Sequence, residues 1–214
     1  MMSYNLIILL FSSFSVGFIH TLMGPDHYIP FIAMSKARQW SIPKTVTITT
    51  VCGIGHVMSA FVLGIIAVSI GIAVTKLNFI ESIRGELAAW FLIIFGLLYF
   101  IWGIRSAFKH HGHSHSHHKL KNMTPWILFV IFVLGPCEPL IPLIIYPAVK
   151  GLTLQVFLIV TLFGFATIFT MLTMVLISVY GTKLIKFKFL ERYGNAVAGV
   201  IICCCGLAIK FVGI

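Results

Sequence analysis

The hydrophobic positions of this chain gather into six long runs, which short polar stretches separate. The runs cover approximately residues 5–35, 45–75, 86–105, 123–149, 152–181 and 193–212. A helix of roughly 20 apolar residues crosses the hydrocarbon core of a bilayer, and only helices or closed barrels satisfy their backbone hydrogen bonds there. The pattern therefore predicts an all-α polytopic membrane protein with six transmembrane helices and no sheet.

Composition supports the same class. Hydrophobic residues make up 59% of the 214 positions, charged residues make up 9%, and the mean hydropathy is +1.06, which excludes an ordinary soluble domain. The N-terminal stretch has no basic segment and no small-residue cleavage site, so we expect the first helix to be retained. We predict one membrane domain over residues 1–214, with repeat 1 at 1–106, a His-rich loop at 107–122 and repeat 2 at 123–214.

The formal charge of +10 predicts an orientation and not a nucleic-acid partner. Eleven of the fifteen Lys and Arg residues lie in three connecting stretches, 36–44, 105–121 and 183–192, and the other four lie on the opposite face. The positive-inside rule places the three basic stretches in the cytoplasm and both termini outside the cell membrane. The expected partner is the lipid bilayer, with a homodimer left open and no nucleic acid.

An internal repeat relates the two halves of the chain. Gly24-Pro25 and Gly135-Pro136 are offset by 111 residues, as are Gly53 and Gly164, and an offset of 110 relates Gly96 to Gly206. The first three predicted helices thus correspond to the last three. Because three is an odd number of crossings, the second copy is inverted in the membrane relative to the first. In transporters built this way, the site lies at the repeat interface near the midplane.

Each Gly-Pro pair is expected to break its helix, the first and the fourth, because proline has no N–H and clashes with the preceding turn. Side chains that can coordinate an ion follow each break, and Asp26 and Glu138 are the acidic residues inside the hydrophobic runs. Ionisable groups at membrane depth usually mark a substrate or ion path. The candidate site residues are His20, Asp26, His27, His56, Cys137 and Glu138.

This combination of imidazole, carboxylate and thiol predicts a first-row divalent metal, most readily Ni²⁺ or Co²⁺ and also Zn²⁺, as the transported substrate. A second signal is the stretch KHHGHSHSHHK, which packs six histidines into nine positions and is typical of weak metal buffering. These histidines are His110, His111, His113, His115, His117 and His118. No organic cofactor is expected.

The segment HTLMGPDH resembles the His-x4-Asp-His signature of nickel/cobalt transporters, although here five residues separate His20 from Asp26. Together with CGIGHVMSAFVLG and GPCEPLIPLIIYPA, it resembles the UreH-type urease-accessory membrane domain over essentially the whole chain. That domain shares a fold group with sulfite exporters and with the CcdA/DsbD thiol-reductant transporters. The resemblance implies metal translocation, and not an enzyme.

Two alternatives come from the same fold group. CcdA-like proteins carry a cysteine next to a helix-breaking proline in each repeat and relay electrons by thiol–disulfide exchange. Cys137 in GPCEP would be one such cysteine, but Asp26 occupies the equivalent position, which leaves Cys52 as the substitute. Cys203, Cys204 and Cys205 are expected to be small apolar filler. Anion export ranks last, because no Lys or Arg is expected near the breaks.

Overall fold

The computed structural model describes residues 4–70, 74–108, 117–183 and 188–212, and these segments contain helices and turns but no strand. The elements in chain order are α1 (Tyr4–Met23), η1 (Pro25–His27), α2 (Ile29–Ala37), α3 (Ile42–Ser69), α4 (Val74–Phe108), α5 (His117–Leu134), α6 (Leu140–Val149), α7 (Thr153–Lys183) and α8 (Lys188–Val212). The all-helical prediction is confirmed for these residues. Of the helices, η1 is a single 3₁₀ turn.

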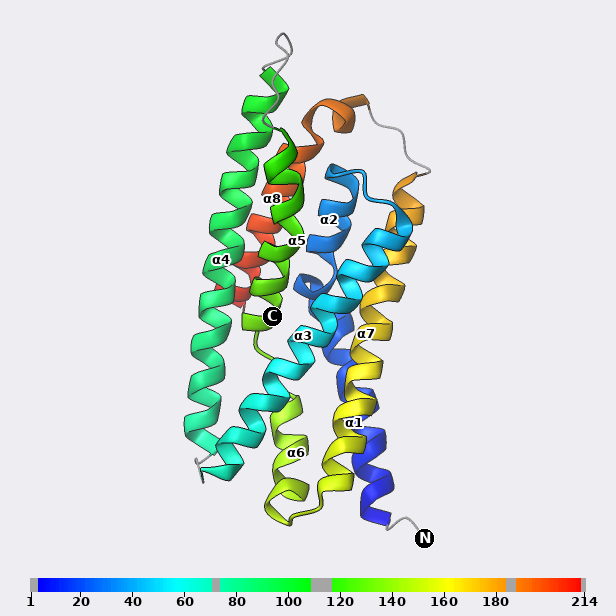
Figure 1. The fold of residues 1–214 in the computed structure, drawn as a ribbon, viewed down its shortest axis with the longest axis vertical. Coiled ribbons are helices and arrows are strands. Elements are labelled where there is room, and N and C mark those ends of the chain that lie inside the picture. Colours follow the sequence, from blue (N-terminus) through cyan, green and yellow to red (C-terminus); the bar gives the residue numbers. More distant parts are fainter. Residues whose placement is uncertain (1–3, 71–73, 109–116, 184–187, 213–214) are drawn as a thin grey trace.

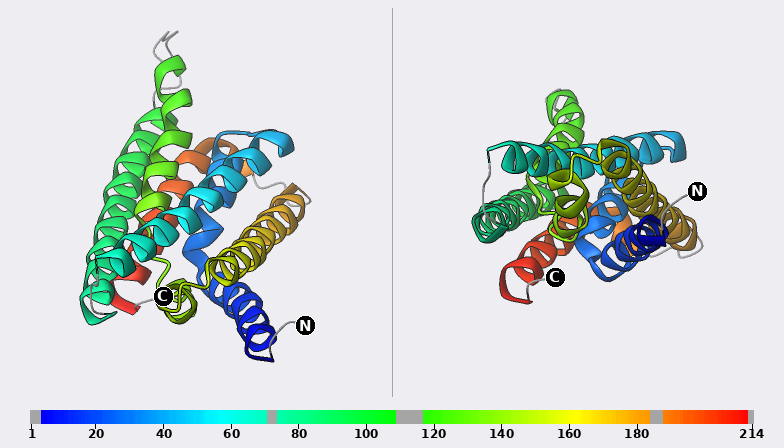
Figure 2. Two further views of the ribbon diagram at one scale, coloured as in Figure 1. Left: turned by 60° about the horizontal axis from the view of Figure 1, so that its bottom comes forward. Right: turned by 90° about the horizontal axis from the view of Figure 1, so that it is seen from below.

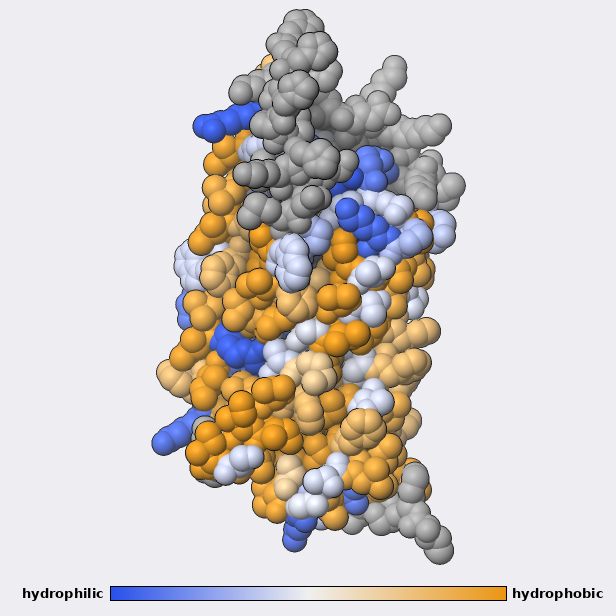
Figure 3. All heavy atoms as spheres, viewed as in Figure 1, coloured by the Kyte–Doolittle hydropathy of each residue, from blue (hydrophilic) through white to orange (hydrophobic). Residues whose placement is uncertain are grey.

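Five helices are long and apolar enough to cross a membrane: α1, α3, α4, α7 and α8. The predicted fourth run, 123–149, is divided between α5 and α6, whose apolar parts are each shorter than a full span. Many large apolar side chains are exposed, such as Phe11 at 74% and Phe157 at 63%. Figure 3 shows that such residues dominate one face between more polar ends. This surface is the one expected of a protein whose solvent is lipid.

The two broken helices run in opposite directions. In Figure 1, α1 starts near the N-terminus at the lower end and leads up to α2, whereas α5 starts at the upper end and leads down to α6. α1 packs along α7, and α5 packs along α3. Both views of Figure 2 keep α4 and α8 together at one side of the molecule.

α4 and α8 approach each other through glycine. A Cβ atom added to Gly96 would lie 2.5 Å from the backbone N of Cys203, and one added to Gly199 would lie 2.4 Å from the backbone N of Phe100. Likewise, a Cβ atom added to Gly103 would lie 2.4 Å from a backbone atom of α8, and one added to Gly206 would lie 2.8 Å from a backbone atom of α4. Small residues permit such contact between membrane helices. The two helices consequently meet backbone to backbone along a seam of four glycines.

Candidate functional site

The first break redirects the chain within three residues. α1 ends at Met23, and Gly24 N–H still donates to His20 O at 2.9 Å, but Pro25 has no N–H to continue the ladder. His27 N–H then donates to Gly24 O at 3.1 Å, which closes the 3₁₀ turn. A Cβ on Gly24 would lie 2.6 Å from His27 Nδ1, so only glycine lets the imidazole fold back over the turn. The predicted break at Gly24-Pro25 is confirmed.

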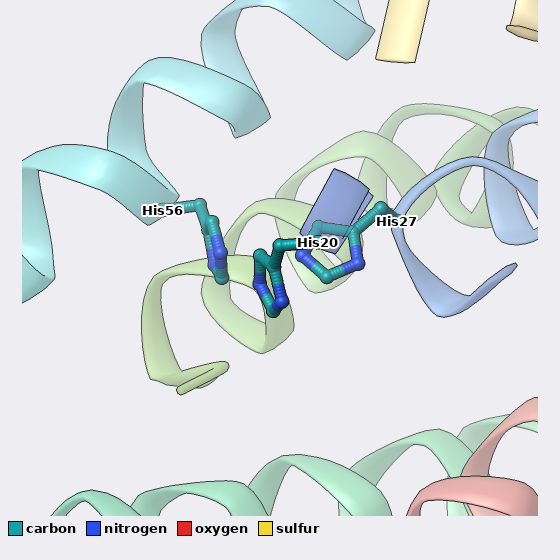
Figure 4. Close-up of side chains that lie close together, drawn as sticks. All are labelled: His20, His27 and His56. Atoms are coloured by element: carbon teal, nitrogen blue, oxygen red, sulfur yellow. The ribbon is translucent and has the colours of Figure 1, made fainter. Parts of the chain in front are cut away.

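Three histidines from three different elements come together beside this break (Figure 4). His20 belongs to α1, His27 to η1 and His56 to α3. The ring centroids of His20 and His27 are 4.8 Å apart, and those of His27 and His56 are 5.1 Å apart, with nearly perpendicular planes. One ring nitrogen from each histidine lies within 4.8 Å of the other two.

Hydrogen bonds orient two of these rings. Nδ1 of His27 lies 3.2 Å from both Gly24 O and the Asp26 carboxylate, and Nδ1 of His56 lies 3.1 Å from Phe132 O. Carbonyl and carboxylate oxygens only accept hydrogen bonds, so both Nδ1 atoms carry the proton. Within the described part of the chain, the Nε2 atoms of His20, His27 and His56 are buried and have no hydrogen-bond partner.

The second break is capped by an ion pair from α4. α5 ends at Leu134, and the guanidinium of Arg84 donates to Val133 O at 2.8 Å and to Gly135 O at 3.3 Å. Cys137 N–H donates to the carboxylate of Glu81 at 3.2 Å, and Arg84 also pairs with Glu81. Arg84 and Glu81 thus satisfy polar backbone groups that Gly135-Pro136 removes from the helical ladder.

Sequence reasoning missed this pair. The third hydrophobic run was expected to begin at residue 86, which left Glu81 and Arg84 in a connecting loop, whereas both belong to α4 and Glu81 is fully buried. The expectation that no Lys or Arg lies near the breaks is therefore wrong, because Arg84 contacts the second one. The i,i+3 spacing of opposite charges, shortly before the 18-residue uncharged stretch 87–104, was the available signal.

Both breaks line one cavity of about 710 Å³. Its wall includes Gly24 of the first break and Gly135 and Pro136 of the second. A Cβ on Gly135 would lie 3.4 Å from His56 Nδ1, so the histidine cluster packs directly against the second break. The expectation that the two breaks meet in the interior is supported by this shared cavity.

The structure divides the six predicted ligands into three groups. His20, His27 and His56 cluster, and Asp26 joins them through His27. Glu138 lines the same cavity but is not part of that cluster. Cys137 is fully buried in an apolar cluster with Leu140 and Ile144 and is not among the residues that line the cavity.

The predicted metal-buffering loop falls mostly outside the described residues. His110, His111, His113 and His115 lie in the stretch 109–116, for which no structure is given, and His117 and His118 form the first residues of α5. Its buffering role stays a prediction.

All five cysteines are free. Cys52 and Cys137, the two thiols considered for a redox pair, belong to two different apolar clusters. Cys205 is buried, whereas Cys204 is exposed, so the consecutive run in α8 faces different surroundings. No second cysteine stands at the first break, where Asp26 and His27 follow Pro25.

A family model described as "Cytochrome C biogenesis protein transmembrane region" matches residues 12–208. No curated protein and no solved structure matches the chain. The match corrects the resemblance to nickel/cobalt transporters and, with it, the interpretation of the chain as a metal transporter. That interpretation rested on the chemistry of possible ligands, which does not distinguish a transported ion from other uses of the same side chains. The thiol–disulfide alternative agrees better with the match.

Proposed function

Because this chain belongs to the family of cytochrome c biogenesis transmembrane regions, we propose that it transfers reducing equivalents across the membrane by thiol–disulfide exchange at Cys137. The observation that carries this proposal is the family match together with the position of Cys137. This thiol stands directly after the Gly135-Pro136 break, between two residues that line the cavity, Pro136 and Glu138. In this role the chain is a carrier and not an enzyme that acts on a metabolite.

The exchange uses one thiol of the chain and two thiols of a partner. The Cys137 thiolate attacks a substrate disulfide, which forms a mixed disulfide and releases one substrate thiol. A dithiol protein of the thioredoxin type then attacks the mixed disulfide and is itself oxidised to a disulfide. This second step releases the other substrate thiol and restores Cys137. Two electrons and two protons pass from the dithiol to the substrate disulfide in each cycle.

A single-thiol cycle follows from the residue at the equivalent break. Asp26 occupies the position where the repeat would place a second cysteine, and it is hydrogen-bonded to His27. Cys52 packs in a different apolar cluster from Cys137. The second thiol that resolves the mixed disulfide is therefore assigned to the dithiol partner and not to this chain.

Residues around the second break position the backbone of Cys137 for this chemistry. Glu81 accepts the Cys137 N–H, and Arg84 donates to the carbonyls of Val133 and Gly135. The side chain itself is fully buried, so a partner reaches the sulfur only when the break opens toward the cavity. The thiol is thereby protected from solvent oxidants between encounters.

The architecture that supports transfer to both sides is two inverted triplets with six crossings. In this arrangement α1, η1 and α2 form one crossing, α5 and α6 form its counterpart, and α3 and α4 correspond to α7 and α8. The helix pairing supports it, since α1 packs on α7 as α5 packs on α3, and α2 packs on α7 as α6 packs on α3. The positive-inside rule then places the basic stretch 105–121 in the cytoplasm and both termini outside.

A reconstituted system tests the proposal. Liposomes carrying the protein hold a small disulfide reporter inside, and reduced thioredoxin with its regenerating system is added outside. We expect wild-type protein to produce trapped thiols well above the rate of protein-free liposomes. Cys137→Ala should reduce the rate to that background, and the matched control Cys203→Ala should keep the wild-type rate.

Two further arms make the result specific. Thioredoxin that lacks its resolving cysteine should become trapped as a mixed disulfide on wild-type protein and not on Cys137→Ala. Cys52→Ser should retain transfer, since a single-thiol cycle does not use it. Full transfer by Cys137→Ala contradicts the proposal, and loss of transfer in Cys52→Ser shows that the second thiol is internal.

A further inference from the structure

We propose that His20, His27 and His56 form a binding site for a divalent first-row transition ion of the zinc class. The ion is a resident ligand of the protein and not a cargo. The inference does not depend on the exchange chemistry of Cys137, because it rests on three nitrogen atoms and their surroundings. These nitrogens come from three separate elements, α1, η1 and α3.

The strongest observation is that three histidines whose rings lie together each have a buried nitrogen without a hydrogen-bond partner in the described segments. Nε2 of each histidine is buried and lacks any hydrogen-bond partner among the described residues. His27 and His56 carry their protons on Nδ1, so their Nε2 atoms present lone pairs. A buried polar atom without a partner costs about 1–3 kcal/mol. A cation bound between these nitrogens satisfies all three lone pairs at once.

The outer contacts have the form found around metal-bound histidines. A ligating histidine usually donates its other ring N–H to a carboxylate or a backbone carbonyl, which fixes its tautomer and orientation. His27 donates to Asp26 and to Gly24 O, and His56 donates to Phe132 O. Asp26 is a positioning residue here, because it acts on the ion through His27.

The distances are within reach of coordination. One ring nitrogen of each histidine lies within 4.8 Å of the others. Two nitrogens that each lie about 2.0–2.1 Å from a tetrahedral zinc ion are about 3.4 Å apart. Each ring therefore has to move by less than about 1 Å toward the common centre. His20 can make the largest move, because it is only partly buried, whereas His27 and His56 are fixed by their Nδ1 contacts.

Charge and access favour a divalent ion. The site opens on the 710 Å³ cavity, whose wall also contains the carboxylates of Asp26 and Glu138. These two groups offset the charge of the ion at membrane depth, where uncompensated charge is costly. Three neutral imidazoles suit zinc, cobalt, nickel and copper ions, whereas Mg²⁺ and Ca²⁺ prefer oxygen ligands. The cavity leaves room for water in a fourth coordination position.

Occupancy would tie the first break to α3, and through α3 to the second break. His56 contacts Phe132 O and lies against Gly135. The ion thus holds together the part of the cavity wall next to the backbone of Cys137, without contacting the thiol itself.

The experiment uses the full chain in detergent with the six histidines of the 110–118 stretch replaced by serine, so that the loop cannot bind metal. Co²⁺ serves as the probe, because its visible absorption reports four-coordinate nitrogen ligands and lacks the thiolate charge-transfer band. We expect one saturable site per chain, with the spectrum displaced by Zn²⁺ and not by Mg²⁺. Cys137→Ala should leave the spectrum unchanged.

Variants of the ligands decide the assignment. His20→Ala and His56→Gln should each weaken Co²⁺ binding by at least about a hundredfold, beyond the 10–100-fold expected for an outer contact. The control Cys203→Ala should bind normally. Because His20 is partly exposed, its variant should keep the wild-type circular dichroism and elution volume. Absence of saturable binding, or binding that survives in both histidine variants, overturns the proposal and would leave the histidines as a proton-exchanging cluster.

Discussion

Arg84→Met is the sharpest test of how the second break is held. The substitution keeps an apolar stem of similar reach but removes the guanidinium that pairs with Glu81 and donates to Val133 O and Gly135 O. Glu81 is fully buried. Breaking a buried pair by removing one partner typically costs about 3–5 kcal/mol, because it leaves an uncompensated charge. We expect Arg84→Met to lower the free energy of unfolding by this amount.

Lys210→Met is the matched control, because Lys210 pairs with Glu86 on the same helix α4 in an exposed setting. Exposed ion pairs contribute little to stability because water screens them, so the free energy of unfolding of this variant should stay close to that of wild type. The measurement is reversible unfolding in mixed detergent micelles, followed by far-ultraviolet circular dichroism at increasing fractions of a denaturing detergent. Alkylation of Cys137 by a maleimide should also be faster in Arg84→Met and unchanged in Lys210→Met.

The double variant Glu81→Gln/Arg84→Met separates pairing from simple loss of packing. Removing the buried charge of Glu81 together with Arg84 should recover part of the loss, with a coupling energy of about 1–3 kcal/mol for groups in direct contact. Additive effects of the two substitutions, or a loss below about 1 kcal/mol in Arg84→Met, would refute the role of the pair as the cap of the break.

Two other outcomes are expected. Gly199→Ala should destabilise the protein by about 1–3 kcal/mol, since its Cβ would lie 2.4 Å from the Phe100 backbone. The control is Gly194→Ala on the same helix, whose Cβ meets nothing within 4 Å; equal unfolding midpoints of the two variants would contradict the glycine seam. Asp26→Asn should weaken Co²⁺ binding by about 10–100-fold in the loop-substituted protein, as outer carboxylates do; a spectral titration with unchanged affinity would show that Asp26 does not position His27.

The breaks were predictable from the sequence because their cause is local. Proline in the interior of a helix has no N–H to continue the ladder and clashes with the preceding turn, and the pairs Gly24-Pro25 and Gly135-Pro136 stand inside long hydrophobic runs. A meeting of the two breaks was expected from the 111-residue offset between them. The histidines His20 and His27 were proposed by the same route, since they flank the first break.

The parts that were not predicted depend on contacts distant in sequence. Glu81 and Arg84 reach the second break from α4, about 50 residues earlier, and hydropathy assigned them to a loop because charge lowers the local average. The side chain of Cys137 is buried away from the cavity wall, although its neighbour Glu138 lines it. Adjacent residues after Pro136 point in different directions, and the stretch between α5 and α6 is too short to show a periodic pattern that predicts which one faces the cavity.

The glycine seam between α4 and α8 has a mechanical consequence. At four glycines the two helices approach each other through backbone atoms. No flexible side chains lie between them that could repack, so sliding or tilting of one helix against the other would create direct clashes. The contacts between α3 and α5 are different, because Gly55 of α3 faces the side chains of Phe129 and Val133 of α5. Packed helices of that kind shift by small shear movements. We therefore expect the α4–α8 pair to be the stationary frame, and α3 and α5 to move against it when Cys137 opens to a partner.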